Sequence, residues 1–242
     1  MAGELRAAAR GSGVLVRSAV PADAGGIAVV QVDGWRAAYA HILPPAELAE
    51  LSLVRAEQLW HGVIGGARES GKQVLVAEGD GGEVLGFAAL GPDEAELGQL
   101  GGRQDVGVRG PPTVHLDHRD TARVGRNSRP NQYAGAPRGG PQLSLPAGEL
   151  YAFYVHPRHW RHGLGGALMD AALRRWTQNG VRAAVLWVYE RNASARAFYE
   201  HHGWHFDPHT PPTGPPPDER ELCYRRRLPL PVRGPDLPGR AS

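Results

Sequence analysis

Residues 149–176 read ELYAFYVHPRHWRHGLGGALMDAALRRW, and they combine a strand pattern, a glycine-rich turn and a helix pattern. The run 149–155 is rich in aromatic residues, which is typical of a strand. From residue 164 on, apolar residues recur at helical spacing, which predicts a helix with one buried face. Between the two lies Gly163-Leu164-Gly165-Gly166. The segment therefore predicts a strand that turns tightly into a helix.

A glycine turn at the start of a helix is suited to binding an anionic ligand. No side chain blocks the backbone amides there, and the helix N-terminus adds about half a positive charge. We therefore expect a pyrophosphate at residues 163–166. The dinucleotide fingerprint G-x-G-x-x-G would need a third glycine where Leu168 stands, so a nicotinamide or flavin oxidoreductase is the least favoured interpretation.

Three segments in order resemble the GNAT superfamily of N-acetyltransferases. The stretch VHPRHWRHGLGGALMDAAL (155–173) resembles its coenzyme A motif Q/R-x-x-G-x-G/A, with Trp160 in place of Gln or Arg. The stretch LWVYERNASARAFYEHHGWHF (186–206) resembles a later strand–helix–strand unit, and VRSAVPADAGGIAVVQVDGWRAAY (16–39) resembles the first strand and helix. The resemblance implies an α/β protein of the α+β type. Its mixed, mostly antiparallel twisted sheet has flanking helices, and a bulged strand splays from its neighbour to admit acyl-CoA.

Around these segments the chain divides into one domain and three looser parts. We expect the domain at 14–228, with flexible tails at 1–13 and 229–242. Residues 91–147 are rich in Gly, Pro and Arg and lack an apolar period. They are interpreted as a disordered insertion that the fold does not need, or alternatively as a lid over the substrate.

Elsewhere the patterns predict ordinary elements. Residues 73–78 and 84–90 flank a Gly/Asp turn and predict a hairpin. We expect a helix capped by Asp23, and a second helix that begins near Pro44-Pro45 and continues toward Trp60. Further strands are expected at 14–17, 183–189, 204–206 and 221–224.

The resemblance also assigns residues to the coenzyme. It implies that the motif strand binds pantetheine through its amides and that the glycine turn binds the pyrophosphate. Asn192 matches a position near the pantetheine arm, although it can equally be a helix N-cap. The cofactor-binding residues implied in this way are Phe153, Tyr154, Val155, Arg161, His162, Gly163, Leu164, Gly165, Gly166 and Asn192.

For catalysis the resemblance implies a proton donor and a base. Tyr199 matches the tyrosine that protonates the leaving thiolate, or it is a core aromatic beside Phe198. Glu149 lies fourteen residues before Gly163, like the strand glutamate that serves as base in some members, or it is an exposed strand end. Trp35 and Tyr39 resemble aromatic residues that wall the acceptor pocket, or they are ordinary core residues.

Composition excludes several other classes. The net charge is only +2, which favours neither nucleic-acid nor membrane binding. The single cysteine, Cys223, cannot form an internal disulfide, and no signal-peptide pattern opens the chain, so we expect a soluble cytoplasmic protein. The expected function is transfer of an acetyl group from acetyl-CoA to a primary amine, without a metal, by a monomer or homodimer. A non-catalytic acyl-CoA sensor is the alternative, and the sequence does not choose the acceptor amine.

Overall fold

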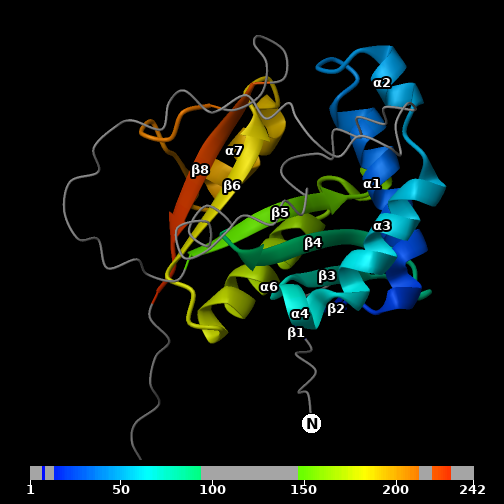
Figure 1. Cartoon of the computed structure of the whole chain (residues 1–242), viewed down its shortest axis with the longest axis horizontal. Helices are drawn as coiled ribbons and strands as arrows, with labels where there is room; N and C mark the ends of the chain where they lie inside the picture. The colour runs from blue at the N-terminus through cyan, green and yellow to red at the C-terminus, as the bar shows by residue number, and fades with distance from the viewer. Residues whose placement is uncertain (1–6, 9–13, 94–146, 213–219, 230–242) are drawn as a thin grey trace, which may run out of the picture.

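The structure of the chain is a computed structural model that describes residues 7–8, 14–93, 147–212 and 220–229 (Figure 1). Among these residues eight strands form one sheet in the order β1-β2-β3-β4-β5-β6-β8-β7. Neighbouring strands are antiparallel except for β5 and β6, which are parallel. The expected mixed sheet is therefore confirmed. Within the same ranges, no helix is both long and apolar enough to cross a membrane.

Four α-helices lie between β2 and β3, and single α-helices follow β5 and β6. The strands are β1 Ala7–Ala8, β2 Leu15–Ser18, β3 Gln73–Glu78, β4 Val84–Pro92, β5 Ala147–Val155, β6 Ala183–Tyr189, β7 His205–Phe206 and β8 Glu221–Arg227. The α-helices are α1 Ala24–Ala38, α2 Pro45–Ala49, α3 Leu53–Gly65, α4 Ala67–Ser70, α6 Leu164–Gln178 and α7 Ala193–His201. Two short 3-10 helices, η1 Pro21–Asp23 and η2 Pro157–His159, precede α1 and α6.

Several elements begin or end at residues other than those expected from the sequence. Strand β4 continues to Pro92 and β5 already begins at Ala147, so the expected insertion at 91–147 overlaps the sheet at both ends. Residues 94–146 lie outside the described part of the chain, where disorder and a lid both stay predictions. The expected leader 1–13 contains the short strand β1, which pairs with Leu15 and Val16.

The region after Pro44-Pro45 forms two helices where one was expected. Helix α2 ends at Ala49, and α3 begins at Leu53. Ser52 separates them because its hydroxyl accepts the Arg55 amide at 3.4 Å, which caps the new helix.

The two faces of the sheet carry different helices. Helices α1 and α3 cover one face, where Ile27 and Trp60 pack against Phe87. Helices α6 and α7 cover the other, where Leu168 and Tyr199 join a second core cluster. This arrangement lays α1 on one side of β5 and the amino-terminal end of α6 on the other.

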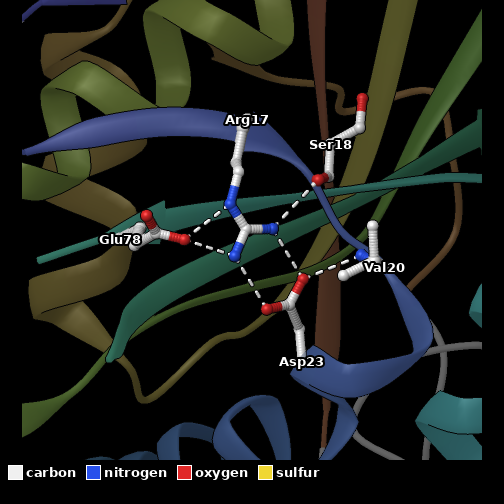
Figure 2. A network of polar contacts seen from close by, with 5 residues as sticks. All are labelled: Arg17, Ser18, Val20, Asp23 and Glu78. Atoms are coloured by element: carbon white, nitrogen blue, oxygen red, sulfur yellow. Dashed lines mark hydrogen bonds and ion pairs between the residues drawn. The ribbon is translucent and has the colours of Figure 1, made fainter. Parts of the chain in front are cut away.

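A polar network holds the start of α1 to the sheet (Figure 2). The Arg17 guanidinium on β2 bonds Glu78 on β3 and Asp23 of η1, with Nη1 2.7 Å from Asp23 Oδ2. Asp23 also accepts the Val20 amide at 2.7 Å. Asp23 therefore makes no cap bond to α1, contrary to the expectation, because Arg17 and Val20 occupy its carboxylate.

Strand β5 is bulged and then leaves its parallel neighbour. Ala89 pairs with Ala152 while Leu90 pairs with Leu150, so Tyr151 is an extra residue in β5. Pairing between β5 and β6 stops at Leu150 with Leu186. Beyond that point β5 stays on β4 while β6 stays on β8, and Figure 1 shows the two halves of the sheet diverging. The bulge and the splay implied by the resemblance are both confirmed.

Candidate active site

The diverging part of β5 presents to the gap backbone groups that no described strand pairs with, although the Val155 carbonyl accepts the Trp160 indole N–H. His156 donates its amide to Leu85 of β4 at 2.9 Å. Because backbone groups alternate sides along a strand, the polar groups of Tyr154 also face β4, whereas those of Phe153 and Val155 face the gap. Among the described strands, none pairs with β5 on that side beyond Leu150. The gap can therefore accept a ligand that bonds like an added strand.

The glycine turn lies at one end of the gap and starts α6. Gly163 has φ 79°, a left-handed conformation that favours glycine, and its carbonyl accepts the Ala167 amide at 3.1 Å. The amides of Leu164, Gly165 and Gly166 belong to the first helical turn, where no helical carbonyl can reach them. These three amides and the helix dipole are the groups at which the sequence predicts that an anion binds.

The two following glycines have different neighbours. A Cβ on Gly165 would lie 3.0 Å from the Phe198 ring on α7, so a side chain there would push α6 away from α7. A Cβ on Gly166 would lie 3.6 Å from His202 Nε2, which is ordinary contact. Gly165 is thus needed for packing, whereas Gly166 tolerates a side chain.

The residues before the turn hold it in an unusual shape. Among the described residues, Arg161 is the one non-glycine residue with a left-handed backbone, with φ 67°. Trp160, where the motif usually has Gln or Arg, donates its indole N–H to the Val155 carbonyl at 2.7 Å. His162 Nδ1 lies 2.8 Å from the Trp160 carbonyl. Both contacts tie the loop to its own backbone and to the end of β5.

A hydrogen-bonded aromatic cluster lies on the α1 side. Trp35 donates its indole N–H to the Tyr154 hydroxyl at 2.8 Å, and its ring meets Tyr39 edge-on at 5.5 Å. Burial raises the pKa of Tyr39 to about 12, and hydrogen bonds with Tyr154 and Asn192 limit the rise. The side chain of Tyr154 thus belongs to this wall, whereas the side chains of Phe153 and Val155 pack against the core cluster on the α6 side of the sheet.

Asn192 links the cluster to α7. Its side-chain oxygen accepts the Ala195 amide at 3.0 Å, so Asn192 caps α7. The amide nitrogen is then free to donate to Tyr39. The cap and the contact with the aromatic wall therefore coexist in one residue.

Tyr199 lies on α7, on the opposite side of β5 from that wall. Its ring is 6.3 Å from Phe153 and 6.4 Å from Trp204. Burial, with a smaller contribution from Tyr39, raises the pKa of Tyr199 above its usual value. The phenol therefore stays protonated throughout any practical assay range, as a proton donor must.

Glu149 lies in β5, one residue before the strands part. It pairs with Val185 of β6 and with Gly91 of β4. Only 5% of the residue is exposed, so it is not the exposed strand end that the alternative interpretation requires. Its position at the closed end of the gap is compatible with the role of base.

His156, at the end of β5, is engaged through both ring nitrogens. Its Nε2 lies 3.2 Å from Asp33 Oδ2 on α1, and its Nδ1 accepts the Arg158 amide at 3.3 Å. The amide contact requires the proton on Nε2, which donates to the carboxylate. Both ring nitrogens are therefore used in holding η2 to α1.

A sheet that parts beside a helix with a glycine turn at its start is the arrangement that the resemblance to the GNAT superfamily implies. Residues 35–204 match the acetyltransferase (GNAT) family, and the chain belongs to this family. It is an acetyl-CoA-dependent N-acetyltransferase of this type.

Relatives of known name agree with that family. The uncharacterized N-acetyltransferase YuaI of Bacillus subtilis is 29% identical over 187 residues, covering 77% of this chain and 78% of its own. "Probable N-acetyltransferase Rv2775" of Mycobacterium tuberculosis is 24% identical over 201 residues, covering 82% and 84%. The PaiA N-acetyltransferase of Thermoplasma acidophilum, solved in complex with coenzyme A, shares the fold with a TM-score of 0.58 at 13% identity, over 89% of this chain and 99% of that one.

Sequence reasoning missed three features around the turn. They are the Trp160 indole bond to Val155, the Phe198 ring beside Gly165 and the His202 ring beside Gly166. The first depends on how the loop turns after β5, and the other two join α6 to α7, which are distant in the sequence. Of these residues, only His202 could be noticed in the sequence, as part of the pair His201-His202 before Gly203, because an imidazole can carry positive charge.

Proposed function

We propose that this protein transfers the acetyl group of acetyl-CoA to a primary amine by direct attack within a ternary complex. One observation carries the proposal: β5 and β6 part at Leu150, and the backbone groups of Phe153 and Val155 face the resulting gap. A pantetheine arm in this gap would take the place of the missing strand neighbour.

The turn that starts α6 supports the rest of the coenzyme. The amides of Leu164, Gly165 and Gly166 would bind the pyrophosphate, and the Arg161 side chain would add positive charge. The Trp160 indole, bonded to Val155, fixes the corner between the strand and this loop. The thioester would then lie deeper in the gap, toward the closed end where Glu149 is located.

The reaction needs two proton transfers. The amine must lose a proton before or as its nitrogen attacks the thioester carbon, and Glu149 is the candidate base, directly or through a water. As the C–N bond forms, the Val155 amide would stabilise charge on the carbonyl oxygen. As the C–S bond breaks, Tyr199 would give its proton to the thiolate.

The acceptor amine would enter beside the aromatic wall of Trp35, Tyr39 and Tyr154. These side chains come from α1, its C-cap and β5, and they are buried or half-buried. Their rings contact one another, while Tyr39 reaches Asn192 on α7, so the wall spans the two sides of the gap. It offers apolar surface with a few hydroxyl groups to a small amine or a chain terminus.

The test is an acceptor panel with acetyl-CoA and the full chain. The panel contains peptides with a free α-amine, lysine peptides, a polyamine, an aminoglycoside and a small alkylamine. We expect free thiol to appear only when an accepted amine is present, with the acetyl group on that amine by mass spectrometry. Initial rates against both substrates should give intersecting lines, as a ternary complex requires.

Two other results have distinct meanings. Tight acetyl-CoA binding without turnover on any amine in the panel would support the non-catalytic sensor. Parallel lines with an isolable acetyl-enzyme would replace direct attack with a two-step transfer.

A further inference from the structure

His202 follows α7, and its ring lies against the first turn of α6. The ring stacks on Phe198 with centroids 4.2 Å apart. Its Nδ1 is 2.8 Å from the Phe198 carbonyl oxygen. Its Nε2 would lie 3.6 Å from a Cβ on Gly166, the third residue of α6. The Nε2 edge of the imidazole therefore lies beside the first turn of α6.

The contact with Phe198 determines what that edge offers. A carbonyl oxygen only accepts hydrogen bonds, so Nδ1 carries a hydrogen. In the neutral ring Nε2 then presents a lone pair, which repels an anion. In the protonated ring Nε2 becomes an N–H donor with positive charge, which attracts one.

We propose that His202 binds the pyrophosphate of coenzyme A in its protonated form, so that coenzyme binding takes up a proton. The inference rests on the proposed function, since it concerns the same glycine turn. It adds a residue outside the coenzyme motif and makes the affinity depend on pH.

Several cationic or titratable groups lie around His202. The helix N-terminus is partly positive. The His201 ring is 5.2 Å away, and the guanidinium of Arg226 on β8 would lie 3.3 Å from a Cβ on Gly203, the next residue in the chain. Arg161 and His162 belong to the same turn. The acidic groups on the two helices are Asp170 on α6, which interacts with Arg226, and Glu200 on α7, which accepts the Tyr224 hydroxyl. A bound pyrophosphate would bring negative charge into this surrounding and would interact favourably with a charged imidazole.

The cleanest probe is dephospho-coenzyme A. Its pyrophosphate is a diester whose charge is constant from pH 5.5 to 8, whereas the 3′-phosphate of coenzyme A titrates near pH 6. We expect dephospho-coenzyme A to bind about tenfold more tightly at pH 5.5 than at pH 8. In His202→Gln the affinity should be flat over this range. His201→Gln, which removes the adjacent exposed imidazole, is the matched control and should keep the pH dependence.

A second measurement needs no variant. Calorimetry of the unaltered protein at pH 6.5 in two buffers of different ionisation enthalpy should show net proton uptake. Binding with flat affinity and no uptake would overturn the inference and leave the proposed function intact. A dependence seen with coenzyme A but not with the dephospho form would overturn the pyrophosphate assignment. Failure to bind either nucleotide would instead count against the proposed function.

Discussion

Leu150 and Leu186 form the last residue pair between β5 and β6, and beyond them each strand pairs on one side only. Glu149 lies just before this pair, and Phe153 and Val155 lie just after it. The point where the sheet divides thus separates the candidate base from the backbone groups offered to the coenzyme.

The glycine turn can be tested at Gly166. Gly166→Asp adds a carboxylate in the first turn of α6, where negative charge stabilises the helix but repels a pyrophosphate. We expect an unchanged or higher melting temperature and an acetyl-CoA affinity lower by about tenfold or more in calorimetry. Gly166→Ala is the control for added bulk and should bind normally. Unchanged affinity in a folded Gly166→Asp protein would remove the pyrophosphate from this turn.

Arg161 combines backbone strain with a useful charge. A left-handed backbone costs a non-glycine residue about 1–2 kcal/mol, so Arg161→Gly should raise the free energy of unfolding by about 1 kcal/mol. The same change should weaken acetyl-CoA binding by removing the cation. Arg161→Ala keeps the strain and loses the charge, so it should weaken binding without the gain in stability. Denaturant unfolding and calorimetry on both variants separate the two effects.

Tyr199→Phe tests the proton donor. The ring keeps its packing against Phe153, but the hydroxyl is lost. We expect kcat to fall by about 10²–10³-fold with nearly unchanged coenzyme affinity, because the proton is needed only as charge develops on sulfur. The comparison requires an accepted amine and conditions in which chemistry limits the rate. A fall of less than about threefold would leave Tyr199 as a packing residue and solvent as the proton donor.

Glu149→Gln tests the base. The amide has nearly the shape of the carboxylate and cannot accept the proton of the amine. We expect kcat to fall by about 10²–10⁴-fold, and the acidic limb of the pH–rate profile to disappear. Coenzyme affinity should change little. A normal profile in the variant would assign deprotonation to water.

Asp23 links stability to pH. Burial alone would raise its pKa, but hydrogen bonds from Arg17 and Val20 outweigh this and lower it. A carboxylate whose pKa is lowered by folding stabilises the protein above its unfolded pKa of about 3.9, and this contribution is lost as the pH falls through the folded value. Asp23→Asn should therefore cost about 2 kcal/mol at pH 7 and progressively less below pH 4 in urea unfolding. A constant difference across this range would mean that charge plays no part.

The elements that could be predicted from sequence depend on neighbours along the chain. The hairpin at β3 and β4, the glycine turn and the Asn192 cap are local patterns, and all three are present. The Trp35 contact with Tyr154 spans 119 residues, and no pattern in one sequence reports it. Local reasoning also erred at Asp23, where the guanidinium of Arg17 competes for the carboxylate that was expected to cap a helix.

The position of His202 beside Gly166 also could not be predicted from the sequence. The pair His201-His202 is visible in the sequence, but the two rings have different surroundings. Only His202 is fixed by a carbonyl and aimed at α6. The choice between the two depends on how α7 packs against α6, which the Phe198 contact with Gly165 determines.

The separation of β5 from β6 also affects the susceptibility of the protein to proteases. Four residue pairs join its two halves at β5 and β6, so opening along that seam disrupts few hydrogen bonds. A ligand that bridges the seam stabilises the closed form by about 2.7 kcal/mol when its concentration is 100 times its dissociation constant. Protease susceptibility should then decrease as the acyl donor becomes abundant. The abundance of the enzyme in a cell would consequently follow the supply of the thioester that it consumes.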